Sequence, residues 1–429
     1  MTPQSRQFLL DLFNTAVAAA HPAGWLPALL PPPPQGRLIV LAAGKGAGAM
    51  SETAEAHYLD RLKFPAQRLD GIAVARHGYG RPTRRVTMVE AGHPVPDEAG
   101  LKAAERALAL ADGAGADDLV LVLMSGGASA NWIAPAAGLT FADKQAVTRA
   151  LLRSGANIGE INTVRKHLSR IKGGRLARHA YPAKVVTLAI SDVPRDEPSA
   201  IGSGPTVPDP TTLADARDVV ARYRLDLPEA MTRALANGTN ETPKPGDAVF
   251  ANTSFTIAAR PLDAIKAVEA KVTEAGYECV SLGDRVEGEA RDVAAAHGKL
   301  ARSLKAQGKR TVIVSGGELT VTIRGNGRGG PNQEYALALA LALDGAPGIS
   351  ALAADTDGTD GGAGSAEDPA GAFADGTTAA RARALGLDPA AYLADNNSTE
   401  FFTRLGDLLQ TGPTYTNVND VRVIVVDRG

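Results

Sequence analysis

The stretch RLIVLAAGKGAGAM, residues 37–50, decides the fold class of this chain. Its aliphatic run predicts a buried strand over residues 37–43, and the glycines that follow predict a tight turn. A helix is expected next, over residues 51–63. A strand, a glycine turn and a helix in this order are typical of the first unit of a parallel α/β sheet.

The same alternation continues along the chain. LVLVLM, residues 119–124, has no polar alternation, which is typical of a strand buried on both faces of a parallel sheet. The pattern predicts a Rossmann-like, doubly wound sheet with right-handed crossovers. Further strands are expected at residues 71–76, 86–92 and 184–190, and helices at residues 4–20, 97–114, 141–157, 211–223 and 228–237.

A chain of 429 residues is longer than one hydrophobic core normally serves, so two domains are expected. The segment NGTNETPKPGD, residues 237–247, has the composition of a linker, and the alternation restarts after it with a strand at 247–252 and a helix at 256–276. We therefore expect an N-terminal domain over residues 1–241, a linker over 242–247 and a second α/β domain over 248–429.

Composition excludes several function classes. The 45 basic and 47 acidic residues nearly balance, so no net field attracts nucleic acid or an anionic membrane. The single cysteine, Cys279, rules out a disulfide framework and zinc sites built on cysteine pairs. No apolar run approaches the length that spans a bilayer. We expect a cytoplasmic protein without nucleic-acid or membrane partners.

Five loops rich in glycine or serine are expected at the carboxyl ends of strands, where open α/β sheets bind ligands. The loops begin at residues 44, 125, 191, 315 and 355, and Ser-Gly-Gly follows a strand in two of them. Backbone N–H groups in such loops can surround an anion. The predicted phosphate-binding residues are Gly44, Gly46, Ser125, Gly126, Gly127, Ser129, Ser315, Gly316 and Gly317.

Charged residues in these loops supply the remaining chemistry. Lys45 is the one lysine inside a glycine turn, and Arg324 and Arg328 lie in RGNGRGGPNQE, where guanidinium groups could bind a carboxylate or a phosphate. Asp192 directly follows a strand and could hold Mg²⁺ together with phosphate oxygens and water. Asp357, in DTDGTD with Asp360, could serve likewise or merely form a turn.

Other motifs fit less well. Gly44, Gly46 and Ala49 have the dinucleotide spacing G-x-G-x-x-A, but the second strand ends in Arg76 and not in the acidic residue that holds a ribose, which leaves NADPH open. There is no P-loop and no protein-kinase signature. The sequence around Ser129 differs from a nucleophile elbow only in having Asn131 at the last glycine.

Eight motifs span most of the chain in a fixed order and together resemble the class II glycerate 2-kinase family, whose members are often labelled hydroxypyruvate reductase. Two departures are Pro331, where many relatives have arginine, and Arg195, where glycine is usual. The motifs are GKGAGAM, HPVPDEAGL (93–101), SGGASA, INTVRKHLSRIKGGRLA (161–177), SDVPRDEPSAIGSGPTVPDPTT (191–212), GRGGPNQE (327–334), DTDGTDG and TGPTYTNVND (411–420).

The resemblance implies ATP- and Mg²⁺-dependent phosphorylation of D-glycerate at its 2-hydroxyl, giving 2-phosphoglycerate and ADP. It also implies a MOFRL-type region over about residues 308–420 and an active site in the cleft between the two domains. The partners would be D-glycerate and ATP, and a homodimer stays open. An NAD(P)H-dependent hydroxypyruvate reductase is the alternative function, and a non-catalytic sugar-acid or nucleotide sensor is a third.

Within this reading, the charged candidates take roles in phosphoryl transfer. Lys45 would neutralise the transferred phosphoryl group, and Asp192 would hold Mg²⁺ or accept the proton of the substrate hydroxyl. Arg328, and less directly Arg324, would bind the glycerate carboxylate or the charge of the transition state. Asn332 and Glu334 are expected at the substrate, where they would orient that arginine, and Asp357 is a second candidate metal ligand. Arg165, Lys166 and His167 form a basic group that could touch a ligand or lie on a solvated helix face.

Overall fold

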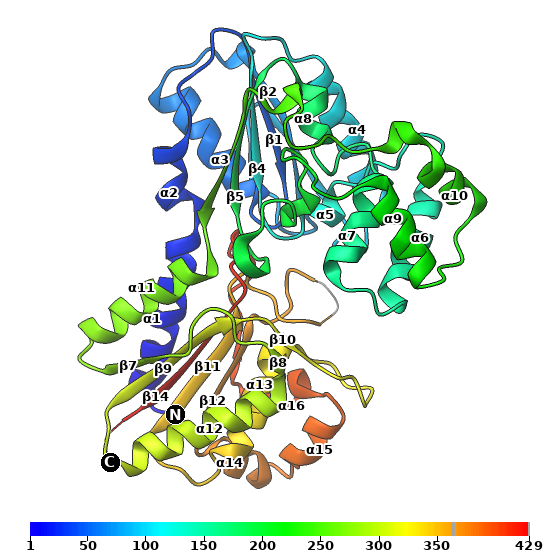
Figure 1. Cartoon of the computed structure of the whole chain (residues 1–429). Coiled ribbons are helices and arrows are strands. Elements are labelled where there is room, and N and C mark those ends of the chain that lie inside the picture. Colours follow the sequence, from blue (N-terminus) through cyan, green and yellow to red (C-terminus); the bar gives the residue numbers. More distant parts are fainter. Residues whose placement is uncertain (363–364, 428–429) are drawn as a thin grey trace. The chain divides into compact units, whose positions relative to one another are not determined.

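The computed structural model describes residues 1–362 and 365–427, and the chain divides into two compact units (Figure 1). The first, which we call the inserted unit, comprises Trp25–Ala258. The second, the split unit, comprises Met1–Gly24 and Ala259–Gly429. The chain therefore starts in the split unit, builds the inserted unit, and then returns.

The inserted unit contains a six-stranded sheet in the order β3-β2-β1-β4-β5-β6. β1 pairs in parallel with β2 and β4, and the β2–β3 and β4–β5 pairs are parallel too. This is the strand order of a doubly wound fold, as expected. The strands are β1 (Leu38–Ala43), β2 (Leu69–Arg76), β3 (Val86–Ala91), β4 (Leu119–Met124), β5 (Lys184–Ile190) and β6 (Thr253–Ala259).

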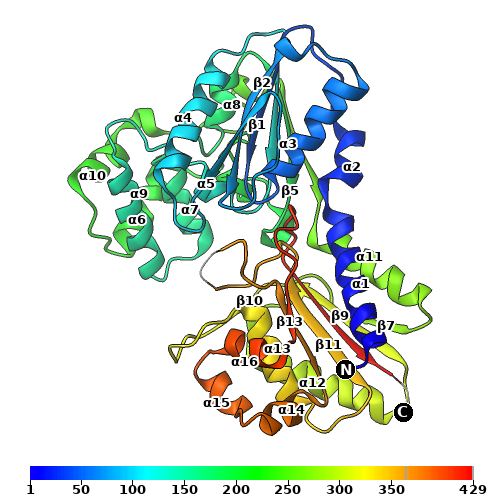
Figure 2. The same ribbon diagram turned by 180° about the vertical axis from the view of Figure 1, so that it is seen from behind.

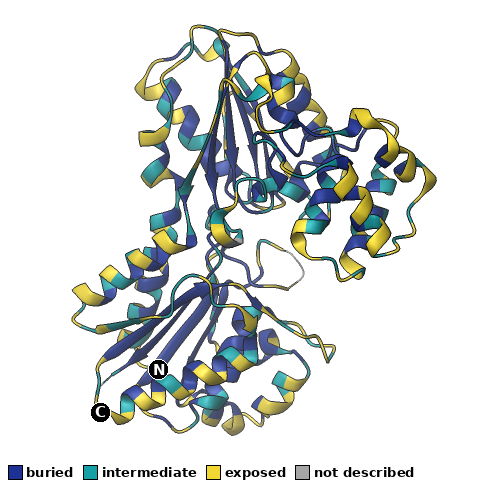
Figure 3. Ribbon diagram, viewed as in Figure 1, coloured by how far each residue is buried: buried dark blue, intermediate teal, exposed yellow. Residues whose placement is uncertain are grey.

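Helices cover both faces of this sheet. α3 lies on one face, and α4 and α8 lie on the other (Figures 1 and 2). Because of this double cover, every residue of β1 and β4 is buried (Figure 3). The helices are α3 (Ala47–Glu55), α4 (Glu98–Asp112), α5 (Ala128–Asn131), α6 (Phe141–Arg153), α7 (Ile158–His167), α8 (Arg175–Ala180), α9 (Leu213–Arg222) and α10 (Glu229–Ala236).

Four of these helices, α6, α7, α9 and α10, surround a small hydrophobic core of their own. Its buried side chains include Leu151, Val164, Val219 and Met231. Helix α7 begins with a capping box in which Asn157 and Glu160 satisfy each other's backbone N–H groups. This helix carries the basic residues Arg165, Lys166 and His167 in its last turn.

The split unit contains a mixed sheet in the order β13-β12-β11-β14-β9-β7. β7 and β9 are parallel, and β14 runs antiparallel to both β9 and β11. The carboxyl ends of β7, β9 and β11 therefore share one edge with the first residue of β14. The strands are β7 (Glu278–Ser281), β9 (Thr311–Gly317), β11 (Ile349–Asp355), β12 (Gly371–Asp375), β13 (Leu408–Leu409) and β14 (Asp420–Val426), with β8 (Gly288–Glu289) and β10 (Leu319–Thr320) paired separately.

Helices α12 and α13 pack on one face of this sheet through Tyr335, Leu339 and their neighbours, and α1 and α11 cover the other. Together with the inserted unit, this arrangement confirms the expected mixed α/β fold with two sheets. The helices are α1 (Pro3–Ala20), α11 (Pro261–Glu274), α12 (Ala290–Ala306), α13 (Pro331–Ala342), α14 (Thr378–Ala384), α15 (Pro389–Ala394) and α16 (Ser398–Leu405). Helix α2 (Pro22–Leu29) includes the boundary between the two units, because the inserted unit begins at Trp25.

The observed division differs from the expected boundaries of 1–241, 242–247 and 248–429. Residues 1–24 belong with the C-terminal part of the chain, and the chain returns to the split unit only at Ala259. The segment 242–247 is also packed at its start, because Thr242 is buried and its hydroxyl donates to Asp209 (3.1 Å). The strand expected at 247–252 is wrong: a short 3-10 helix occupies Ala248–Phe250, and the strand follows at Thr253–Ala259.

Candidate functional site

The loops after β1 and β4 meet at the point where the strand order of the inserted unit reverses. The chain winds outward from β1 to β2 and β3 and then returns to place β4 on the other side of β1. In open α/β sheets this switch point is where ligands bind, beyond the carboxyl ends of the strands. The loops there are the glycine turn around Lys45 and the Ser-Gly-Gly loop that starts at Ser125.

The N–H groups of the glycine turn are already used inside the protein. Gly44 donates to the Val74 carbonyl (3.0 Å), Lys45 to the Gly126 carbonyl (2.8 Å), and Gly46 to the Ser125 hydroxyl (2.7 Å). Acceptors within the protein therefore take these N–H groups in this structure, and phosphate binding by Gly44 and Gly46 stays a prediction. These glycines let the two loops approach each other closely.

The Ser-Gly-Gly loop, in contrast, has free donors. Among the residues that the structure describes, no acceptor takes the N–H of Gly126 or of Gly127. Gly127 has φ +89°, and a Cβ placed on it would lie 3.0 Å from the His93 ring and 3.6 Å from Lys45 Cγ. Two consecutive free N–H groups beside a lysine form an arrangement that binds anions. Phosphate binding by Gly126 and Gly127 stays a prediction, and their N–H groups are available for it.

Ser129 lies just beyond these glycines and is held by side chains from two other segments. Its hydroxyl is 2.8 Å from the hydroxyl of Ser203 and 3.0 Å from Lys172 Nζ, which also donates to the Ser129 carbonyl (2.8 Å). An Arg165 Nη contacts the same carbonyl at 3.5 Å. The site therefore gathers two hydroxyl groups and two cationic side chains next to the free N–H groups.

The basic group at the end of α7 is not a solvated helix face. Lys166 is buried and paired with Asp209 (3.3 Å), and His167 is fully buried with its Nε2 3.0 Å from Glu241. Arg165 is half-buried and points toward Ser129. Of these three residues, only Arg165 contacts the loop at the switch point.

Asp192 directly follows β5, which lies next to β4 in the sheet. Since β1, β4 and β5 run in parallel, its half-buried carboxylate stands at the same edge as Lys45 and the Ser-Gly-Gly loop. Nearby Arg195 has φ +65°, in the left-handed region that favours glycine. This explains physically why the resembling family has glycine at that position.

The second Ser-Gly-Gly does not repeat the first. Ser315, Gly316 and Gly317 are the last residues of β9 and are buried in the sheet. Arg422, on the neighbouring strand β14, donates to the Ser315 hydroxyl (3.3 Å) and to the carbonyls of both glycines. Carbonyls and not N–H groups face this arginine, and phosphate binding by these three residues stays a prediction.

Arg324 and Arg328 lie in an exposed loop before α13, and neither guanidinium is paired with any of the described residues. Asn396 and Asn397 fix the loop, since their side chains accept from the backbone N–H groups of Arg324 (2.7 Å) and Arg328 (3.3 Å). Both guanidinium groups are therefore exposed, and their contact with a ligand stays a prediction. Pro331 is the first residue of α13, a position that proline favours.

Asn332 and Glu334 have structural partners that the sequence did not reveal. Glu334 is buried between Arg291 (2.7 Å) and the Asn396 amide (2.8 Å). The Asn332 amide donates to Asp420 (2.7 Å) and Asp360 (3.1 Å). Neither side chain contacts Arg328 among the described residues, and their contact with substrate stays a prediction.

Several carboxylates lie near the edge of the split unit's sheet at which β11 ends and β14 begins. Asp360 accepts from the backbone N–H groups of Asn332 (3.0 Å) and Gln333 (2.8 Å) at the start of α13, and burial raises its pKa to about 7. The buried Asp357 accepts twice from Thr359, which is typical of a turn. In the described ranges, no three His, Cys, Asp or Glu side chains form a group that could hold a metal ion.

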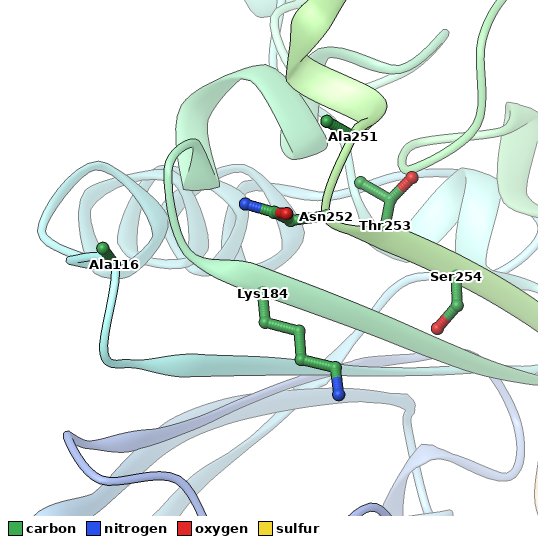
Figure 4. A pocket seen from close by; sticks show the side chains of 6 residues that line it. All are labelled: Ala116, Lys184, Ala251, Asn252, Thr253 and Ser254. Atoms are coloured by element: carbon green, nitrogen blue, oxygen red, sulfur yellow. The ribbon is translucent and has the colours of Figure 1, made fainter.

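A surface pocket elsewhere in the inserted unit is separate from this site. Lys184 begins β5 and Ala116 precedes β4, so the pocket lies at the amino edge of the sheet, opposite the glycine loops. Figure 4 shows the side chains around it, which are those of Ala116, Lys184, Ala251, Asn252, Thr253 and Ser254.

Fold and site together define a doubly wound α/β protein with two free backbone N–H groups in the loop at its switch point. A family model described as "Domain of unknown function (DUF4147)" matches residues 8–236, and one described as "MOFRL family" matches residues 311–420. The chain belongs to the class II glycerate 2-kinase family, as its motifs indicate. The part of the chain that the structure describes has no helix both long and apolar enough to cross a membrane.

Two relatives and one crystal structure illustrate the family. A putative hydroxypyruvate reductase of Agrobacterium vitis is 48% identical over 98% of this chain and 94% of its own length. A D-glycerate 2-kinase of Thermotoga maritima is 36% identical, with 98% of each chain covered. The crystal structure of glycerate kinase from Thermotoga maritima superimposes with a TM-score of 0.86, at 36% identity, covering 99% of this chain and 100% of that one.

Sequence reasoning missed Lys172, Ser203 and His93 as residues at the switch point. All three stand inside quoted motifs, so their motifs were the available signal. What the sequence lacked was a reason to choose them, because a lysine such as Lys172 is ordinarily expected on the surface.

Proposed function

We propose that this protein transfers the γ-phosphoryl group of ATP to the 2-hydroxyl of D-glycerate, giving 2-phosphoglycerate and ADP. The observation that carries the proposal is the pair of free N–H groups at Gly126 and Gly127, beside Lys45, at the switch point. Several relatives are named glycerate kinases, which supports D-glycerate as the substrate.

The residues present can supply what phosphoryl transfer requires, which is positioning and neutralisation of charge. The N–H groups of Gly126 and Gly127 hold phosphate oxygens, and Lys45 offsets the charge on the transferred group. A bond forms between the substrate oxygen and phosphorus as the bond to the ADP oxygen breaks. Arg328, with Arg324 as a second candidate, binds the glycerate carboxylate.

Asp192 fits either of two roles in this reaction. Mg²⁺ in kinases is commonly held by one or two carboxylates together with substrate phosphates and water, and Asp192 offers one such carboxylate at the right edge of the sheet. When bound, Mg²⁺ offsets phosphate charge. Alternatively, Asp192 accepts the proton of the 2-hydroxyl. Asp192→Asn separates the roles: a lost ligand raises the Mg²⁺ concentration needed for half-maximal rate, whereas a lost base lowers the rate at every Mg²⁺ concentration.

The alternative, an NAD(P)H-dependent hydroxypyruvate reductase, is favoured by the names of two relatives. The glycine turn speaks against it. In a dinucleotide fingerprint the glycines let the pyrophosphate approach the backbone. Here the Ser125 hydroxyl occupies that place, because it accepts the Gly46 N–H at 2.7 Å.

Product identification tests the proposal. The protein is incubated with D-glycerate and Mg-ATP, and separately with hydroxypyruvate and NADH or NADPH, and products are identified by phosphorus NMR. We expect 2-phosphoglycerate and no oxidation of either cofactor; cofactor oxidation without phosphoglycerate would establish the reductase instead. Lys45→Ala should fold normally and lose about 100- to 1,000-fold in turnover. Lys184→Ala, at the opposite edge, is the matched control and should keep its rate.

A further inference from the structure

Lys172 is a buried lysine whose environment offers it no negative charge. Its side chain is 1% exposed, and its Nζ donates to the carbonyl and the hydroxyl of Ser129. Burial, together with the nearby Arg165 and Lys144, lowers its pKa well below the usual value of 10.5. Burying a lysine without a counter-charge is costly because its charged form is disfavoured, so proteins rarely keep one that has no task.

The same lack of counter-charge extends to its neighbours. Lys144 is buried and donates only to the carbonyls of Arg165 (2.9 Å) and Leu168 (3.1 Å). Arg165 has a buried Nε without any partner. Over residues 1–362 and 365–427, neither lysine and no part of Arg165 forms an ion pair with a carboxylate. Lys166, by contrast, is a buried lysine on the same helix that has Asp209 at 3.3 Å.

The groups around Ser129 are almost all hydrogen-bond donors. Ser129 and Ser203 present hydroxyls, and Arg165 presents a guanidinium. The free N–H groups of Gly126 and Gly127 lie three and two residues before Ser129. A phosphate group carries more acceptor oxygens and more charge than a carboxylate, so it matches this donor-rich surrounding better.

We propose that Arg165 and Ser129 bind a phosphate group of the nucleotide, and that Lys172 is the positioning residue that holds Ser129 and supplies charge beneath it. The proposal rests on the proposed function, because that function supplies the nucleotide. With this assignment, Arg165 and Lys172 join Lys45 as the positively charged side chains of the phosphate site. Ser203 completes the arrangement by fixing the Ser129 hydroxyl at 2.8 Å.

Lys172→Met tests the proposal, since methionine has nearly the same shape but neither charge nor donor. Arg178→Met is the control: it removes one positive charge from the exposed face of α8 in the same unit. Binding of inorganic tripolyphosphate is measured by calorimetry at several salt concentrations. Charge-assisted hydrogen bonds are worth enough that we expect about 10- to 100-fold weaker binding and a shallower salt dependence for Lys172→Met, and neither for Arg178→Met.

A second variant keeps the test decisive if Lys172→Met does not fold. Arg165→Gln changes a half-buried side chain, and it should weaken tripolyphosphate binding while leaving the KM for D-glycerate unchanged. Unchanged tripolyphosphate affinity in both variants would overturn the proposal. It would also be overturned if the variants raised only the KM for D-glycerate, because these side chains would then bind the glycerate carboxylate and not a phosphate. Tripolyphosphate binding requires no turnover, so failure of the kinase reaction itself is recognised separately, in the wild-type protein.

Discussion

Gly44→Ala should disable the proposed phosphate site by adding a single methyl group. Gly44 has φ +114°, and a Cβ placed on it would stand 2.4 Å from both the carbonyl oxygen and the hydroxyl of Ser125 and 2.7 Å from the Gly126 carbonyl. Real Cβ atoms do not approach so closely, and two of these neighbours are backbone atoms. The Ser-Gly-Gly loop must therefore move by about 1 Å to restore ordinary contact distances.

The size of the effect follows from two contributions. A left-handed backbone costs a residue with a side chain about 1–2 kcal/mol, and an overpacked site costs about 1–3 kcal/mol more. We therefore expect the free energy of unfolding to fall by about 2–5 kcal/mol. Because Gly126 and Gly127 move with the loop, a displacement of about 1 Å should also lower turnover by about 100-fold.

Gly138→Ala separates the two contributions. Gly138 belongs to the same unit and has φ +81°, but nothing lies within 4 Å of a Cβ placed on it. This variant should lose about 1–2 kcal/mol and keep its activity. The assays are urea unfolding, tripolyphosphate binding and initial rates with D-glycerate and Mg-ATP. Full phosphate affinity in Gly44→Ala, or an equal loss of affinity in Gly138→Ala, would refute the reasoning.

Three further predictions concern the split unit and the metal. Burial raises the pKa of Asp360 from 3.8 to about 7, so the folded state keeps its proton longer than the unfolded state, and stability from this group falls as pH rises from about 4 to about 7. This rise in pKa corresponds to about 4 kcal/mol of unfolding free energy. Urea unfolding at pH 4–8 should show the fall in stability in the wild type and a weaker dependence on pH in Asp360→Asn. The same pH dependence in both proteins would contradict this prediction. Glu334→Gln breaks the buried pair with Arg291 and should lower the free energy of unfolding by about 3–5 kcal/mol without changing the KM for D-glycerate. A raised KM in the folded variant would instead indicate that Glu334 contacts the substrate. EDTA should stop phosphorylation and added Mg²⁺ should restore it, so a full rate in EDTA would count against Mg²⁺.

The fold was predictable because its signal is local. LVLVLM is apolar along its whole length, KVVTLAI is apolar except at Lys184 and Thr187, and the structure places strands at these residues, 119–124 and 184–190. The prediction of a strand at 247–252 is wrong because DAVFAN is short and mixes polar with apolar residues, a pattern that fits a 3-10 helix equally well. The return of residues 1–24 to the second unit is a long-range packing event, which local periodicity does not encode.

The site was predictable only in part, because identical short motifs met different partners. Ser-Gly-Gly after β4 keeps free N–H groups, whereas Ser-Gly-Gly at the end of β9 faces Arg422, which pairs with Ser315 in the register of β14. The glycines around Lys45 follow an anion-binding spacing, yet Ser125, 79 residues away from Gly46, takes the donor. The roles of Lys45, Asp192 and Arg328, and the placement of the site between two domains, stay predictions.

The path of the chain sets an order for folding. All six strands and the covering helices of the inserted unit come from one continuous segment, so this unit can close as soon as it leaves the ribosome. The sheet of the split unit cannot, because β14 lies between β11 and β9 and is synthesised after every other strand of that sheet. Until residues 420–426 emerge, two half-sheets expose unpaired edges that invite wrong partners. Slow synthesis over this last stretch would prolong the exposure.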